Sequence, residues 1–249
     1  MKITIVKNAG DVGAEAAKFI IQEIQRKKRK FVLGLATGRT MIPFCRNLVR
    51  LIRRNKIDTN RIVTFNLDEY VSLNEKDKGS LRYFMEKNFF SRIDIKKENI
   101  HFLDGKAFDL KKEYKRYEEE IKEAGGIDLQ ILGIGRNGHI GFNEPWSSFT
   151  SRTREVLLSE ETRRDNARFF GSLKKVPRRA LTIGIATIFE SKKIILLASG
   201  KQKAKAVALA LRGEINPKVP ASILRRHKNV KFILDKRAGG KLKQDYNKL

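Results

Sequence analysis

The chain has 249 residues, and its 54 lysines and arginines outnumber 28 aspartates and glutamates, which gives a formal charge of +26 at pH 7. No long uncharged apolar run occurs and the start, Met1 to Val6, has the pattern of a strand, so we expect neither a membrane span nor a secretory leader. The single cysteine, Cys45, excludes an internal disulfide and favours a reducing, cytoplasmic setting.

Length and charge also limit the number of domains and the kinds of partner that the chain can have. Its length suits one large core and no linker rich in proline, glycine and serine divides it, so we expect a single domain over residues 1–249. The positive charge would attract nucleic acid or phosphorylated small molecules. Because basic residues are spread along the chain without aromatic residues at regular stacking intervals, the charge favours a solvated surface over a nucleic-acid footprint.

Short apolar runs mostly alternate with segments in which apolar residues recur three or four positions apart. The first kind predicts strands at Ile3 to Val6, Phe31 to Leu35, Ile62 to Leu67, Ile127 to Ile134, Leu181 to Ile185, Ile194 to Ala198 and Val230 to Leu234. The second kind predicts helices at Ala14 to Arg26, Ile42 to Arg54, Leu81 to Phe90, Leu110 to Ala124 and Lys201 to Leu211. The alternation predicts an α/β fold with a doubly wound, mostly parallel sheet and helices on both faces. The lysine-rich stretch 241–249 is expected to be mobile and is given no function.

The segment from Ala36 to Thr40 follows the second predicted strand, and a helix is expected to open at about Met41. Backbone N–H groups, the hydroxyls of Thr37 and Thr40 and the helix dipole would converge there, which suits a phosphate group. The spacing is not that of a Walker loop or a dinucleotide fingerprint. An ordinary strand-to-helix turn capped by threonine is the alternative.

Two adjacent carboxylates, Asp68 and Glu69, follow the third predicted strand. Since side chains alternate along a strand, only one of them is expected to face a pocket, and we favour Asp68. A partly desolvated carboxylate has a raised pKa and can take a proton from carbon beside a carbonyl or imine. Two solvated turn acids are the alternative.

The turn 135–145 after the fourth predicted strand holds His139 between glycines, with Glu144 five residues on. Histidine exchanges protons near neutral pH, and a carboxylate can orient its ring, so the two predict an acid/base dyad. A structural histidine is the alternative, which the flanking glycines and the nearby carboxylate disfavour. His101 and His227 have no such setting and are given no role.

Several segments together resemble glucosamine-6-phosphate deaminase, in order and nearly from end to end. They are Leu33 to Thr40, Thr64 to Tyr70, Gly133 to Pro145, Ser151 to Arg154, Asn166 to Phe170, Ala180 to Gly184, Gln202 to Ala204 and Pro220 to Ser222. The resemblance implies the Rossmann-like fold of deaminases and 6-phosphogluconolactonases. It also implies conversion of glucosamine 6-phosphate and water to fructose 6-phosphate and ammonia in amino-sugar metabolism, with neither metal nor organic cofactor.

The resemblance also implies catalytic roles for single residues. Asp68 is similar to the base that moves a proton between C2 and C1, His139 to the group that assists ring opening, and Glu144 to its carboxylate partner. Asn137 stands where many members have aspartate, and it can form hydrogen bonds but cannot share a negative charge with the histidine. The expected ligands of the substrate phosphate are Thr37, Gly38, Arg39, Thr40, Arg168 and Lys203.

Three further positions depart from the family pattern. Arg39 replaces a small residue and would either add a phosphate contact or crowd the approach that glycine permits, while Leu81 and Trp146 replace a tyrosine and a small residue. A 6-phosphogluconolactonase and a non-catalytic sugar-phosphate-binding protein are the alternative functions. The sequence leaves open the oligomeric state and the preference between glucosamine and galactosamine 6-phosphate.

Overall fold

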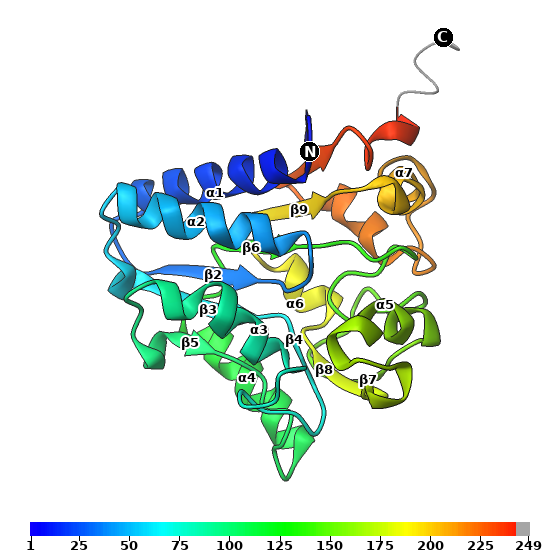
Figure 1. Cartoon of the computed structure of the whole chain (residues 1–249), viewed down its shortest axis with the longest axis horizontal. Coiled ribbons are helices and arrows are strands. Elements are labelled where there is room, and N and C mark those ends of the chain that lie inside the picture. The colour runs from blue at the N-terminus through cyan, green and yellow to red at the C-terminus, as the bar shows by residue number, and fades with distance from the viewer. Residues whose placement is uncertain (243–249) are drawn as a thin grey trace.

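The computed structural model describes residues 1–242, and a seven-stranded sheet forms its centre (Figure 1). The strands are β1 (Lys2–Val6), β2 (Phe31–Leu35), β3 (Ile62–Asn66), β5 (Ile100–His101), β6 (Leu129–Leu132), β9 (Ile194–Ala198) and β10 (Val230–Asp235). Their order is β1-β10-β9-β6-β2-β3-β5, and every pairing is parallel. The chain runs outward from β2 through β3 to β5 and returns on the other side with β6, so the topological switch lies between β2 and β6. Such switch points are where open α/β sheets bind ligands.

Helices flank this sheet, as expected for a doubly wound fold. They are α1 (Ala9–Arg26), α2 (Met41–Arg54), α3 (Leu81–Asn88), α4 (Leu110–Glu123), α5 (Glu160–Phe170), α6 (Ile185–Phe189) and α7 (Ala204–Arg212). Short 3-10 helices are η1 (Thr59–Arg61), η2 (Phe90–Arg92), η3 (Lys97–Asn99), η4 (Leu173–Lys175), η5 (Lys201–Lys203), η6 (Pro220–Arg226) and η7 (Gly240–Leu242). α1 packs along α2 and against β9 and β10. Tyr117 of α4 donates its hydroxyl hydrogen to the carbonyl oxygen of Asn66 at 2.8 Å, which ties α4 to the end of β3.

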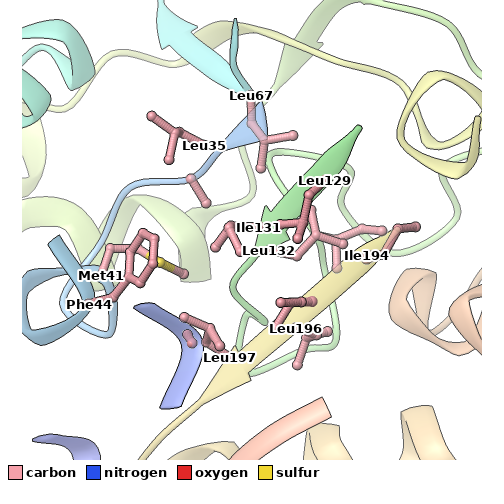
Figure 2. Packing of buried hydrophobic residues seen from close by; sticks show 14 of the residues in the cluster. Leu35, Met41, Phe44, Leu67, Leu129, Ile131, Leu132, Ile194, Leu196 and Leu197 are labelled. Atoms are coloured by element: carbon pink, nitrogen blue, oxygen red, sulfur yellow. The ribbon is translucent and has the colours of Figure 1, made fainter. Parts of the chain in front are cut away.

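The core consists of the central strands and the helix faces packed on them. Every residue of β2 and β9 is buried, as is usual for parallel strands covered on both faces. Figure 2 shows Leu35, Ile131 and Leu197 from neighbouring strands on the side of the sheet where Met41 of α2 packs. This packing holds the carboxyl ends of the strands, and therefore the loops that follow them, in fixed positions.

A second sheet lies beside the first, where the sequence predicted no separate unit. It is antiparallel, in the order β4 (Asp68–Tyr70), β8 (Arg179–Thr182) and β7 (Arg154–Leu157). The predicted strand Leu181 to Ile185 was therefore wrong in its extent, because β8 ends at Thr182 and α6 begins at Ile185. A Cβ on Gly184 would lie only 2.1 Å from the carbonyl oxygen of Ser151, so the chain passes its neighbour too closely there for any other residue. An apolar run alone carries no information on its partner strands.

Other elements also differ from expectation. α1 begins at Ala9 instead of Ala14, because the side chain of Asn8 caps its first turn by accepting from the backbone N–H groups of Gly10 and Asp11. Within residues 1–242, no helix is long and apolar enough to cross a membrane. The expectation of mobility for residues 241–249 falls almost wholly on 243–249, which lie outside the described residues.

Candidate active site

A cavity of about 1130 Å³ opens at the carboxyl ends of the central strands, beside the topological switch. It is as large as the largest pockets that usually enclose small ligands, about 1,000 Å³. Among the residues expected in the site, those that line the cavity are Thr37, Gly38, Arg39, Thr40, Asp68, His139, Arg168 and Lys203. The other two, Asn137 and Glu144, lie behind His139. The loops after β2, β3, β6 and β9 therefore meet around one space.

Asp68 is the first residue of β4, and its side chain faces the cavity although the residue is only 6% exposed. No described residue forms a hydrogen bond or ion pair with its carboxylate. Burial, and to a smaller extent the adjacent Glu69, raise the pKa of Asp68 to about 8. A Cβ on Gly141, which has a φ of 57°, would lie 3.5 Å from Oδ2 of Asp68, so glycine keeps this carboxylate approachable.

Glu69 has a different environment, and it does not line the cavity. Its Oε1 accepts hydrogen bonds from the backbone N–H of Tyr70 at 2.8 Å and of Leu81 at 3.0 Å, and its Oε2 accepts one from Arg82 at 2.8 Å. Burial raises the pKa of Glu69 to about 7, although these hydrogen bonds oppose the rise. Glu69 therefore caps the first turn of α3, while Asp68 is left free to react.

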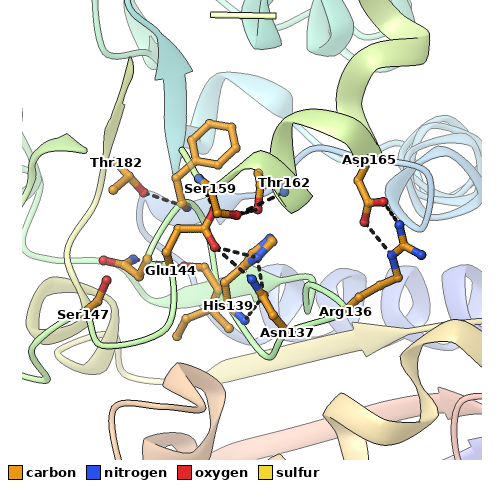
Figure 3. Close-up of polar contacts among 12 residues, drawn as sticks. Arg136, Asn137, His139, Glu144, Ser147, Ser159, Thr162, Asp165 and Thr182 are labelled. Atoms are coloured by element: carbon orange, nitrogen blue, oxygen red, sulfur yellow. Dashed lines mark hydrogen bonds and ion pairs between the residues drawn. The ribbon is translucent and has the colours of Figure 1, made fainter. Parts of the chain in front are cut away.

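His139 contacts Glu144 mainly through Asn137 (Figure 3). Oδ1 of Asn137 lies 2.7 Å from Nδ1 of His139 and also accepts the backbone N–H of His139 at 3.2 Å. Nδ2 of Asn137 donates to Oε2 of Glu144 at 2.9 Å, whereas the direct distance from His139 Nδ1 to that oxygen is 3.7 Å. Because Oδ1 can only accept, this chain places the imidazole hydrogen on Nδ1 and leaves the lone pair of Nε2 free.

The other carboxylate oxygen of Glu144 fixes the start of α5. Oε1 accepts hydrogen bonds from the backbone N–H of Ser159 at 3.2 Å and from its hydroxyl at 3.0 Å, and Ser159 is the N-cap of α5.

Burial lowers the pKa of His139, with Lys203 acting in the same direction and Glu144 opposing it. The imidazole is therefore neutral at pH 7 and can accept a proton.

Positive charge is concentrated where Arg39, Arg136, Arg168 and Lys203 line the cavity. Burial, followed by the repulsion of Arg39, lowers the pKa of Arg168, and burial with the nearby cations Arg136 and Arg168 lowers that of Lys203. Cations held this close together are stabilised by an anion between them. The side chain of Thr40 does not cap α2; its hydroxyl lies 3.4 Å from Oγ of Ser199. These groups suit a phosphate dianion.

Two further charged residues of the cavity wall were not predicted from the sequence. Arg136 and Asp165 both line the cavity and form a two-point ion pair, with Nε of Arg136 2.9 Å from Oδ2 of Asp165 (Figure 3). Arg136 lies within the segment Gly133 to Pro145, but nothing in that segment indicates its partner, because Asp165 lies 29 positions away and outside the segments that resemble the family. Of the two remaining departures, Leu81 lines the cavity, whereas Trp146 does not and is 73% exposed.

The chain is similar to known proteins over nearly its whole length. Residues 7–233 match the family model of glucosamine-6-phosphate isomerases/6-phosphogluconolactonase. A glucosamine-6-phosphate deaminase of a Clostridium botulinum strain is 49% identical over 247 residues, which are 99% of each chain. The protein of the same name from a Thermoanaerobacter species is 48% identical over 238 residues, covering 96% of this chain and 94% of the relative.

Solved structures extend the similarity to the fold. A structure described as a monomeric glucosamine-6-phosphate deaminase superposes with a TM-score of 0.94 at 44% identity, over 96% of this chain and 99% of its own. A 6-phosphogluconolactonase from Thermotoga maritima superposes with a TM-score of 0.74 at 23% identity, over 94% of this chain and 99% of its own. At that identity the second likeness supports the shared fold alone.

Proposed function

Since this chain belongs to the family of glucosamine-6-phosphate isomerases and 6-phosphogluconolactonases, we propose that it catalyses the deaminase reaction. Glucosamine 6-phosphate and water become fructose 6-phosphate and ammonia through an aldose-ketose isomerisation coupled to loss of the amine. A reaction that consumes water is often called a hydrolysis, but this one also moves a proton between two carbons, so the term hydrolase describes it only loosely. The assignment extends to this chain the activity for which its relatives at 46–49% identity are named.

One structural observation carries the proposal: Asp68 and His139 open onto the same cavity, which Arg168 and Lys203 also line. A phosphate held by the two cations anchors the sugar by a group that does not react. The base then has to act on only one carbon, and binding energy from the phosphate is converted into orientation at that carbon.

Ring opening is the step we propose for His139. With its hydrogen on Nδ1 held by Asn137, the neutral ring can accept the proton of the C1 hydroxyl at Nε2. The C1–O5 bond then breaks, C1 becomes the aldehyde, and the imidazolium passes its proton to the ring oxygen O5. Glu144, hydrogen-bonded to Asn137, stabilises the imidazolium that forms for a short time.

Isomerisation and loss of the amine follow at C2. Ionised Asp68 takes the proton from C2 while a proton of the substrate ammonium passes to O1, which gives a neutral enolamine. Asp68 then returns its proton to C1, giving a protonated imine at C2. Water adds to that imine carbon and ammonia leaves, so the product is the ketose phosphate. A base with a pKa of about 8 is strong enough for this transfer and is still partly ionised at neutral pH.

The lactonase reaction and simple binding are the competing functions. Lactone hydrolysis needs no base over C2, whereas here the acid that faces the sugar is a desolvated carboxylate with no described partner. A non-catalytic sensor would need the phosphate site but not the chain of groups behind His139. Both observations favour the deaminase.

The test is to incubate the protein separately with glucosamine 6-phosphate, galactosamine 6-phosphate and 6-phosphogluconolactone. Ammonia and ketose phosphate are followed for the first two substrates, and acid release for the third. Equimolar ammonia and fructose 6-phosphate from glucosamine 6-phosphate are expected. Lactone hydrolysis without ammonia would overturn the proposal, as would tight binding without turnover.

We further propose that one catalytic domain spans the chain, because the cavity draws residues from Lys7 to Arg237. A cytoplasmic setting is supported by the single, buried Cys45. The substrate is a small sugar phosphate, and we expect no nucleic-acid partner despite the charge of +26. Binding to mixed-sequence DNA that persists at physiological salt would contradict that expectation.

A further inference from the structure

The ion pair between Arg136 and Asp165 joins two parts of the cavity wall. Arg136 lies in the turn that also carries His139, and Asp165 lies on α5 one turn before Arg168. Two N–H groups of the guanidinium donate to the two carboxylate oxygens, a geometry that holds both side chains in place. The side chains are 46% and 31% exposed, so solvent reaches the pair from the cavity.

Asp165 is a carboxylate inside a site that otherwise favours anions. Among described residues the acids lining the cavity are Asp68, Asp165 and Asp235. Asp68 is the proposed base, and both oxygens of Asp235 accept the backbone N–H of Gly200, at 3.1 and 3.0 Å. Asp165 raises the pKa of Lys203 whereas Arg136 lowers it, so both charges act on Lys203, an expected ligand of the phosphate.

We propose that Asp165 competes with the substrate phosphate for Arg136 and so weakens phosphate binding, which makes the pair a determinant of phosphosugar affinity and product release. The identity of the phosphosugar rests on the proposed function, but the competition itself does not. When the site is empty, Asp165 neutralises Arg136. A phosphate between Arg168 and Lys203 meets the repulsion of Asp165 and gains only part of the attraction of Arg136.

Inorganic phosphate is the probe, and its Kd is measured by calorimetry without turnover. Asp165→Asn is expected to lower that Kd by about three- to tenfold, the effect of one unit charge acting through partly solvated protein. Arg136→Gln is expected to raise it by a similar factor, because a cation is lost and Asp165 is left unpaired. The double variant is expected to bind nearly as the parent does, since the two changes oppose each other.

A matched control exists on the same helix. Glu160 forms an i,i+4 ion pair with Arg164 at 2.5 Å, both side chains are more than 60% exposed, and neither residue lines the cavity. Glu160→Gln is expected to leave the phosphate Kd within about twofold of the parent value. Thermal unfolding of each variant tests whether it is folded. We expect the variants of Arg136 and Asp165 to fold, because both side chains are partly exposed.

The opposite role for the pair would be a clamp that holds α5 over the site. In that case Asp165→Asn would bind phosphate more weakly than the parent, and that result would overturn the inference. Unchanged phosphate binding in Asp165→Asn, or binding too weak to measure at millimolar phosphate, would overturn it as well. If the phosphate Kd values of the variants follow the predicted order but the protein releases no ammonia, the proposed function is wrong and the inference stands. Ammonia release with no gain in phosphate affinity for Asp165→Asn would do the reverse.

Discussion

Oδ1 of Asn137 lies 2.7 Å from Nδ1 of His139, while Nδ2 of the same amide donates to Glu144 at 2.9 Å. An uncharged amide therefore stands between the imidazole and the carboxylate. The amide fixes the imidazole tautomer by geometry, without placing a second negative charge beside the ring. Burial then keeps the pKa of His139 below its ordinary value.

Replacing this amide by a carboxylate tests that account. Asn137→Asp is predicted to raise the pKa of His139, because a carboxylate in contact with Nδ1 stabilises the imidazolium. The measurement is an NMR titration of the imidazole signals of His139 in the parent and in the variant. An unchanged pKa for His139 would mean that Asn137 does not contact the ring in solution.

Ionisation of Asp68 is predicted to lower the free energy of unfolding as the pH rises. Its pKa in the folded protein, about 8, is above its ordinary value near 4, so the folded protein holds a proton that the unfolded chain releases. The stability this proton provides is fully present below pH 4 and is lost as the pH rises through 8. Asp68→Asn removes the loss and should exceed the parent in free energy of unfolding by at least about 1 kcal/mol at pH 9. Denaturant unfolding at pH 5 and pH 9 measures it; equal pH dependence in the two proteins would contradict it.

Replacing the neighbouring carboxylate by an amide is predicted to lower stability, because Glu69 accepts hydrogen bonds that Asp68 does not. Glu69→Gln puts an amide against three backbone N–H donors, so the cap of α3 is weakened and the free energy of unfolding falls by about 1–3 kcal/mol. Turnover by the folded fraction should remain within about tenfold of the parent, because Glu69 does not reach the cavity. Loss of turnover equal to that of Asp68→Asn would show that Glu69 is also a catalytic acid.

Gly141 is predicted to be required by the chemistry as well as by the backbone. In Gly141→Ala, a φ of 57° strains the residue and the new Cβ lies 3.0 Å from Thr182 Oγ1 and 3.5 Å from Asp68 Oδ2. Both stability and kcat should fall, stability by about 1–2 kcal/mol. Gly125→Ala is the control, since its φ is 83° but nothing lies within 4 Å of the added Cβ. Its stability should fall comparably while kcat is unchanged; equal kcat in both variants would contradict the prediction.

The parallel sheet was predictable because its strands are continuous apolar runs separated by helices of regular period. α5 was not, since its sequence, from Glu160 to Phe170, is mostly charged and only Thr162 is fully buried. It is defined by its ends, where Ser159 caps the first turn and Gly171, with a φ of 78°, ends the helix. The strands β4 and β7 are three and four residues long, too short for a periodic pattern, and form because β8 pairs with both.

The residues of the site were also only partly predictable from the sequence. Asp68 and His139 could be found because unusual residue types follow apolar strands, and Thr37 and Gly38 because a turn opens a helix there. The pairing of Arg136 with Asp165 depends on how α5 lies over the turn 135–145, and one arginine among 54 basic residues carries no signal of its own. Likewise, spacing placed Glu144 near His139, but only the folded turn shows Asn137 between them.

Proton transfer between C2 and C1 by Asp68 is the central claim, and hydrogen exchange measures it most directly. The protein is incubated with fructose 6-phosphate and ammonia in deuterated water, and deuterium at C1 of the ketose is followed by NMR, with Glu69→Gln as the matched amide control. The parent and Glu69→Gln are predicted to incorporate deuterium at C1, while Asp68→Asn, still binding phosphate, loses at least about 1,000-fold in rate. Incorporation by Asp68→Asn at a rate close to that of the parent would contradict the account.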